Sequence, residues 1–266
     1  IKEAIKKIVD KQDLTYDEAY GVINEIMSGR TTQVQNAAFL AALSTKSTKT
    51  ETIDEITGCA KAMRDHSIKV EHDMDVLEIV GTGGDRSQSF NISTTSAVVA
   101  AGAGVVIAKH GNRAVSGKCG AADVLAELGF NLLVSPAAME RSIGENGIGF
   151  MFAQRLHPKF ALVAPLRRAL GIRTIFNMFG PLCNPAGATR MVVGVFASNL
   201  TELFAAALEG LGVKHALVVH SNDGLDEISC GDTTRVTELR DGRIKTYELY
   251  PEMLLGETYP LADLAG

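Results

Sequence analysis

A glycine-rich loop is the first stretch whose residue types could do chemistry. The segment GTGGDRSQSFNIST, residues 81–94, follows the hydrophobic run DVLEIV and precedes a segment of small residues. Loops of this kind, between a strand and a helix, expose backbone N–H groups at a helix N-terminus and bind phosphate groups. The loop has neither the Lys-Ser/Thr ending of a P-loop nor the GxGxxG spacing of a dinucleotide site. It predicts a phosphate site of another kind, although a tight turn before a capped helix would use the same residues.

Basic and polar residues follow the next expected strand. The segment AKHGNR, residues 108–113, carries Lys109, His110, Asn112 and Arg113. Because ligands of open α/β sheets bind beyond the carboxyl ends of the strands, we expect these side chains to lie beside the phosphate loop. A solvated strand end is the alternative.

Two adjacent acids follow a later strand. The segment GLDEIS, residues 224–229, contains Asp226 and Glu227. On a loop both carboxylates can face one cation, and hard oxygen ligands beside phosphates suit Mg²⁺, which uses few protein ligands. A solvated acidic turn is the alternative.

Three arginines lie in the segment 164–186, namely Arg167, Arg168 and Arg173. A guanidinium can hold a carboxylate in a two-pronged pair, so one of them could bind an acidic substrate. Stabilisation of a helix C-terminus explains them equally well. His157 precedes a proline and, taken alone, indicates a structural role.

Helices must make up residues 1 to about 70. Thr15 and Glu18 form a capping box, and apolar residues then recur on one helical face up to Ile26. The segments 31–46 and 48–66 repeat this pattern. We expect a small helical bundle.

From residue 75 strands and helices alternate, which predicts a largely parallel sheet covered on both faces. The expected strands are 75–80, 103–111, 131–135, 148–153, 190–196 and 215–220, with helices at 121–130, 136–147 and 199–212. Residues 157–171 should form a helix that rejoins the N-terminal bundle. Residues 235–250 should form a hairpin that turns at Asp241 and Gly242.

The composition limits the partners. The net charge is −5 and the pI about 5.7, so no global positive field favours nucleic acid or an anionic membrane. No apolar stretch approaches the roughly twenty residues of a membrane span. The four cysteines lie far apart without metal-type spacing, which favours a reduced, cytoplasmic compartment.

Four motifs in this order resemble the anthranilate phosphoribosyltransferase family. They are GTGGDRSQSFNIST, KHGNRAVSGKCGAADVLAELG, RRALGIRTIFNMFGPLCNPA and GLDEIS. The resemblance implies a helical domain, residues 1–72, rejoined by about 157–185, that is hinged to an α/β domain, residues 73–266. It also implies a homodimer formed through the helical domains, Mg²⁺ dependence, and transfer of a phosphoribosyl group from phosphoribosyl pyrophosphate to anthranilate.

The resemblance also assigns site residues. For phosphoribosyl pyrophosphate these are Gly81, Gly84, Asp85, Ser89, Asn91, Ile92, Ser93, Thr94, Lys109, His110, Gly111, Asn112, Arg113, Ala114, Val115, Ser116, Gly117 and Ala121. For anthranilate they are Gly81, His110, Asn112, His157 and Arg167, and for Mg²⁺ they are Ser93, Asp226 and Glu227. Lys109 would act electrostatically on the leaving pyrophosphate, and no residue is required as a general acid or base.

The chain departs from the family pattern at Gly117, Cys119 and Ala121, where serines are common, and its last residues stop short of the family's final helices and strands. Two other functions share parts of the pattern. A pyrimidine nucleoside phosphorylase has the same fold but a different, Lys-bearing phosphate loop. A non-catalytic relative that binds nucleic acid should show a basic groove, which the pI and the acidic pair disfavour.

Overall fold

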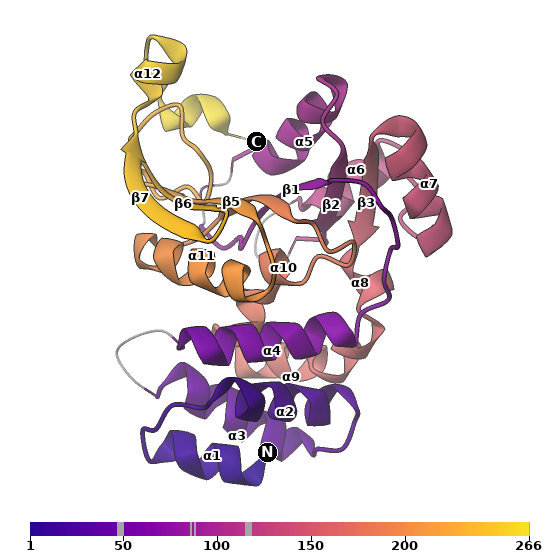
Figure 1. The fold of residues 1–266 in the computed structure, drawn as a ribbon, viewed down its shortest axis with the longest axis vertical. Helices are drawn as coiled ribbons and strands as arrows, with labels where there is room; N and C mark the ends of the chain where they lie inside the picture. Colours follow the sequence, from indigo (N-terminus) through magenta and orange to yellow (C-terminus); the bar gives the residue numbers. More distant parts are fainter. Residues whose placement is uncertain (47–50, 86, 88, 115–118, 266) are drawn as a thin grey trace.

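The computed structural model describes residues 1–46, 51–85, 87, 89–114 and 119–265. A small helical domain and a larger α/β domain lie one above the other along the long axis of the molecule (Figure 1). This arrangement confirms the expected fold class, whereas a hinge motion between the two parts stays a prediction.

The helical domain begins with four helices that are capped by their own sequence. They are α1 (Lys2–Val9), α2 (Tyr16–Met27), α3 (Gln33–Ser44) and α4 (Ile53–Asp65). Thr15, Thr32 and Thr52 each accept a hydrogen bond from the backbone N–H three residues later, and the side chain there returns the bond. These capping boxes begin α2, α3 and α4 through hydrogen bonds that span only three residues.

The α/β domain is built on one sheet of order β3-β2-β1-β4-β5-β6-β7. The first five strands pair in parallel, and β5, β6 and β7 pair antiparallel. The strands are β1 (Leu77–Gly81), β2 (Ile107–Gly111), β3 (Ile148–Phe152), β4 (Arg190–Gly194), β5 (His215–Ser221), β6 (Thr234–Arg240) and β7 (Arg243–Leu249). Connections leave β1 toward β2 on one side and return to β4 on the other, so the β1–β4 boundary is a topological switch point, where ligands bind.

Helices cover both faces of this sheet (Figure 1). Between the strands lie α5 (Ile92–Gly102), α6 (Ala121–Glu127), α7 (Pro136–Asn146) and α11 (Thr201–Gly210), the last preceded by η3 (Ser198–Leu200). After β3 the chain returns toward the helical domain through α8 (Ala153–Leu156), η1 (Pro158–Leu162), α9 (Ala164–Leu170), η2 (Ile175–Asn177) and α10 (Phe179–Leu182). The described chain ends with α12 (Pro251–Leu255) and η4 (Leu261–Leu264).

One hydrophobic core joins the two domains. Phe39 and Ile56 from the helical domain belong to the same buried cluster as Phe204 of α11 and Val218 of β5. A shared apolar core opposes independent movement of the two parts, because separating them would expose apolar surface to water. None of the described helices is long and apolar enough to span a membrane.

Two expected elements are wrong. Residues 131–135 are not a strand but a turn after Gly129, whose φ is +88°; Leu132 is buried beside Phe152 of β3, but the segment does not pair with the sheet. Residues 157–171 are not one helix but η1 followed by α9, since Pro165 lacks the N–H that a continuous helix needs there. The expected hairpin is confirmed, and both turn residues, Asp241 and Gly242, have positive φ angles of 49° and 75°.

Candidate active site

The glycine-rich loop and the acidic loop meet beyond the carboxyl ends of β1 and β5. The Gly83 N–H donates to Asp226 Oδ2 over 2.7 Å. A Cβ on Gly81 would lie 2.5 Å from Asp226 Oδ2, and one on Gly194 would lie 1.5 Å from the Asp226 carbonyl oxygen. Both positions therefore need glycine, and Gly194 is a site-forming residue that the sequence reasoning missed.

The N-terminus of α5 faces the same region with donors to spare. Its N-cap residue, Asn91, makes no side-chain capping bond to the helix and instead donates through Nδ2 to the Cys119 carbonyl over 3.2 Å. Thr94 is buried, and its hydroxyl has no hydrogen-bond partner among the described residues. An uncapped helix N-terminus with a free buried hydroxyl suits an anion such as phosphate.

The two predicted metal ligands are carboxylates that are costly to ionise without a cation. Burial, together with the charge of Asp85, raises the pKa of Asp226 to about 6. Burial and the charge of Asp226 raise the pKa of Glu227 to about 8, which the nearby Ser93 N–H partly offsets. A divalent cation would relieve this repulsion, so the donor set fits Mg²⁺. Within the described part of the chain no three His, Cys, Asp or Glu side chains could hold a metal ion by themselves, and Mg²⁺ commonly completes its shell with water and substrate phosphates.

Lys109 is buried in the floor of this region. Its Nζ donates to the Ile79 carbonyl over 2.7 Å. Burial lowers the pKa of Lys109, while the charges of Glu78 and Glu227 act against that loss of positive charge. Glu78 is fully buried in the central strand and escaped the sequence reasoning, because the run DVLEIV reads only as a hydrophobic strand.

His110 and His157 form a pair of buried rings with centroids 5.1 Å apart. His110 Nδ1 lies 3.1 Å from the Gly180 carbonyl, whereas His110 Nε2 and both ring nitrogens of His157 have no partner among the described residues. Burial lowers the pKa of His110 to about 4 and that of His157 to about 3. Both rings are therefore neutral at physiological pH.

The loop after β2 is anchored by an acid that the sequence reasoning did not single out. Asp123 accepts hydrogen bonds from the backbone N–H groups of Ala114 and Gly120 and pairs with Arg113 over 2.7 Å. Asn112 Oδ1 accepts from the Arg113 N–H over 2.8 Å. Arg113 is thus held at the base of the loop, and Ala121 begins α6 behind it. The predicted residues Val115, Ser116 and Gly117 lie outside the described residues.

Two of the three arginines have distinct positions. The Arg167 guanidinium lies over the rings of Phe160 and Phe176, 5.0 and 5.8 Å from their centroids, and forms no hydrogen bond or ion pair with any described residue. Burial lowers its pKa, as expected for a cation held away from water. Arg173 donates to the Gly84 carbonyl over 2.7 Å and stacks on Phe196, so it supports the glycine-rich loop. No contact among the described residues joins Arg167 to that loop.

Other predicted residues shape the glycine-rich loop. Gly83 and Gly84 have left-handed φ angles of 66° and 79°. Asp85 Oδ1 accepts from the Ser87 N–H, and Ser89 forms an isolated bridge with Ala265. The structure therefore brings together the loop, the α5 N-terminus with Ile92 and Ser93, Lys109 and the acidic pair.

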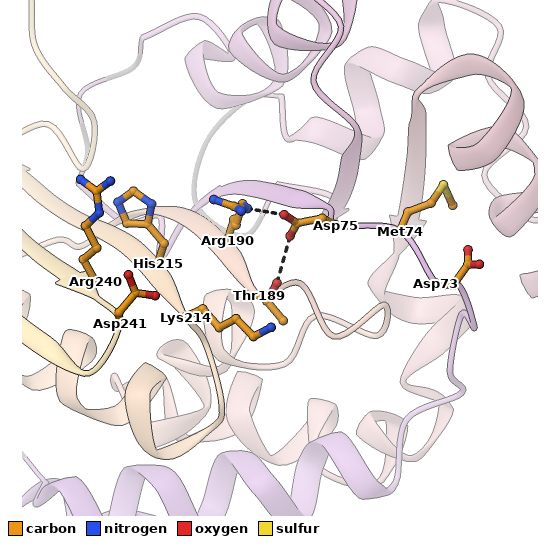
Figure 2. A pocket seen from close by; sticks show the side chains of 9 residues that line it. All are labelled: Asp73, Met74, Asp75, Thr189, Arg190, Lys214, His215, Arg240 and Asp241. Carbon is orange, nitrogen blue, oxygen red and sulfur yellow. Dashed lines mark hydrogen bonds and ion pairs between the residues drawn. The ribbon is translucent and has the colours of Figure 1, made fainter.

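A separate pocket of about 610 Å³ opens at the opposite edge of the sheet and contains none of the predicted residues (Figure 2). Its lining is mostly charged: Asp75 bonds Thr189 and Arg190, and His215 pairs with Glu238 beside the pocket. These residues lie at the N-terminal ends of β4 and β5, away from the predicted site.

Comparisons with known proteins agree with this geometry. Residues 2–67 match the helical bundle domain of a glycosyl transferase family, and residues 73–266 match its a/b domain. The chain is 53% identical over 266 residues to an anthranilate phosphoribosyltransferase from Methanobrevibacter smithii, covering 100% of this chain and 78% of the relative. A relative of the same name from Lachnoclostridium phytofermentans is 51% identical, with the same coverage.

Solved structures lead to the same family. The anthranilate phosphoribosyltransferase of Thermus thermophilus superposes with a TM-score of 0.91 at 43% identity, covering 99% of this chain and 78% of that one. The enzyme of Saccharomyces cerevisiae in complex with PRPP and Mg superposes with a TM-score of 0.88 at 29% identity, covering 99% and 76%. The chain therefore belongs to the anthranilate phosphoribosyltransferase family.

Proposed function

We propose that this protein transfers the phosphoribosyl group of phosphoribosyl pyrophosphate to the amine of anthranilate, a step of tryptophan biosynthesis. The observation that carries this proposal is the convergence of an uncapped helix N-terminus, a buried lysine and two repelling carboxylates at the switch point of the sheet. This combination suits an anion with a bound divalent cation rather than a neutral ligand. Among the relatives, the yeast enzyme has been solved with PRPP and Mg and, separately, with 4-fluoroanthranilate.

The phosphates would occupy the region between the glycine-rich loop and Lys109. The unpaired Thr94 hydroxyl at the α5 N-terminus can donate to them, and Lys109 has donors left after its bond to Ile79. Asp226 and Glu227, with Ser93, would hold Mg²⁺, which supplies charge neutralisation of the leaving pyrophosphate.

Anthranilate would bind on the side of the helical segment that follows β3. Arg167 offers a partly buried guanidinium for the carboxylate, and the aromatic ring could pack near Phe160 and Phe176. Asn112, Gly81 and the two neutral histidines would complete this half of the site. Their neutral state suits an uncharged aromatic amine, because no imidazolium repels the developing positive charge on nitrogen and sugar.

The reaction is a substitution at the anomeric carbon. The amine nitrogen forms a bond to this carbon as the bond from carbon to the pyrophosphate oxygen breaks, and the proton of the resulting ammonium group passes to solvent. Lys109 and the loop amides stabilise charge on the departing oxygens, and Arg167 orients the amine. Positioning of this kind can contribute up to about 7–11 kcal/mol.

The chain is also proposed to form a homodimer through its helical domain and to act in the cytoplasm. Exposed apolar side chains such as Val34 of α3, which is 78% exposed, support an interface there. Sedimentation at several protein concentrations tests the proposed dimer. A monomer at micromolar concentration would refute it.

One assay tests the proposed reaction. The fluorescence of anthranilate should fall only when phosphoribosyl pyrophosphate and Mg²⁺ are both present. Parallel assays for nucleoside phosphorolysis and for salt-dependent binding to nucleic acid should be negative. Unchanged fluorescence with all components present would refute the proposed reaction.

A further inference from the structure

An ionisable residue lies in the middle of the sheet, where a parallel strand is normally apolar. Glu78 of β1 is fully buried, and β1 lies between β2 and β4. Burial raises its pKa to about 8. A carboxylate in such a position is strongly unfavourable unless it has dedicated partners, so its contacts show what it is used for.

The partners of Glu78 all belong to the segments that form the active site. The His110 N–H donates to both carboxylate oxygens, over 3.1 and 2.8 Å. Asn184 Nδ2 donates to Glu78 and also to the Ala108 carbonyl, the latter over 2.9 Å. The Asn184 amide cannot be turned around, because its oxygen accepts from the Ala186 N–H over 2.8 Å. Every contact made to the carboxylate is a donor, which favours its ionised form.

These side chains take the place of backbone pairing between two strands. β1 and β4 are in register over five residues, from Leu77 to Gly81, and β2 and β3 are in register from Ile107 to Gly111. Between β1 and β2 the register consists of Leu77 opposite Ile107 alone. Beyond that pair, His110 gives its N–H to Glu78, and the Ile79 carbonyl accepts from Lys109 Nζ.

We propose that Glu78 is a positioning residue of the transfer reaction, which holds the end of β2, with Lys109 and His110, at a set distance from the glycine-rich loop on β1. A continuous backbone ladder would place these strands closer, whereas the carboxylate and the lysine stem keep them apart. Above its pKa of about 8 the Glu78 carboxylate is ionised, and its charge then favours the ammonium form of Lys109. Asn184 assists by fixing the carboxylate from behind. This role rests on the proposed function.

The test is Glu78→Gln, assayed above pH 8, where the wild-type carboxylate is ionised, so that the substitution keeps the shape and removes the charge. We expect kcat/KM for phosphoribosyl pyrophosphate to fall roughly 10- to 100-fold, because a charge-assisted contact is lost beside the phosphate site. Asn184→Ala keeps the charge and should give a smaller loss in the same direction. If Glu78→Gln does not fold, Asn184→Ala and the second variant described below decide whether Glu78 has the positioning role.

The second variant is Glu78→Asp, which keeps the charge and the acceptors for the His110 N–H and Asn184 but shortens the side chain. It should lose at least about tenfold less kcat/KM than Glu78→Gln. The matched control is Glu55→Gln in the helical domain, another fully buried glutamate that pairs with a lysine. It should lower the melting temperature without changing kcat/KM.

Binding separates this proposal from the reaction itself. Calorimetry with phosphoribosyl pyrophosphate and Mg²⁺ should show the same order of variants as the kinetics. Binding by the wild type without turnover would refute the transfer reaction alone, and the affinity ratio would then decide the role of Glu78. No binding by the wild type would overturn both. A Glu78→Gln kcat/KM within twofold of wild type, or a loss for Glu78→Asp as large as that for Glu78→Gln, would overturn the positioning role.

Discussion

Two buried lysines, one in each domain, make opposite use of their hydrogen-bonding capacity. Lys46 of the helical domain contacts Asp13 and both oxygens of Glu55, so its ammonium is fully paired. Lys109 of the sheet donates to one carbonyl, that of Ile79, and to no carboxylate among the described residues. A buried ammonium with donors to spare is unfavourable in isolation, which indicates that Lys109 is arranged for a ligand.

The pKa values of the two lysines are shifted in opposite directions. Burial lowers the pKa of Lys46, but its bonds to Asp13 and Glu55 outweigh burial, so its pKa is raised. Burial lowers the pKa of Lys109, and the charges of Glu78 and Glu227 do not fully compensate. The lesson is that burial of a lysine does not mark a functional site, whereas incomplete pairing of a buried lysine does.

The largest effect should come from replacing each lysine by methionine. Lys109→Met should lower kcat by roughly 100- to 1,000-fold, as loss of a preorganised donor to a developing oxyanion does. Lys46→Met should leave kcat near wild type but cost about 3–5 kcal/mol of stability, because it strands Glu55 without a charge partner. Steady-state kinetics measures the change in kcat, and urea denaturation measures the change in stability. A fall in kcat for Lys46→Met would contradict the proposed difference between the two lysines.

The acidic loop should respond next. The variant Asp226→Asn/Glu227→Gln should lower activity by roughly 100-fold at millimolar Mg²⁺ and shift the Mg²⁺ titration upward, because amides lack the charge that holds the ion. Circular dichroism should remain native. Asp223→Asn, three residues before this pair, is the control because its carboxylate already bonds Ser229. An unchanged Mg²⁺ titration would show that the two acids form a solvated turn and do not bind the metal ion.

Arg167 separates the two substrates. Arg167→Ala should raise the anthranilate KM roughly 10- to 100-fold, since it removes a charge-assisted contact worth about 1.5–3 kcal/mol. The KM for phosphoribosyl pyrophosphate should change far less. Arg168→Ala is a matched control on the same helix, where the side chain is exposed. Equal KM increases for both substrates, with a lowered melting temperature, would show that Arg167 only stabilises its helix.

The last prediction concerns stability rather than activity, and it depends on pH. The folded pKa of His157, about 3, lies below the unfolded value of 6.5, so the unfolded chain binds more protons as the pH falls. Stability due to neutral His157 is therefore present above pH 6.5 and decreases toward pH 4, by up to about 3 kcal/mol. His157→Asn should flatten this part of the stability profile in denaturation experiments. His66→Asn, at a more exposed histidine whose pKa burial also lowers, should flatten it less.

Most helices and strands were accessible from local signals. The threonine caps of α2, α3 and α4 act within three residues, and the Asp-Gly turn selects the β6–β7 hairpin within two. The expected strand at 131–135 is wrong because an apolar run alone does not say whether a neighbouring strand will pair with it. The expected helix at 157–171 is wrong because Pro165 interrupts the backbone ladder inside an otherwise helical apolar period.

The sequence by itself determined the helical caps, the alternation of strands and helices, and the loops that hold glycine, lysine and adjacent acids. Only the tertiary structure decided that Asp226 lies against Gly81 and Gly83, and that Glu78 reaches across to His110 and Asn184. The reason is that capping and periodicity act over a few residues, whereas these contacts join segments more than thirty residues apart through sheet order. A glutamate in an apolar run has no local signal of its purpose until the neighbouring strand supplies its donors.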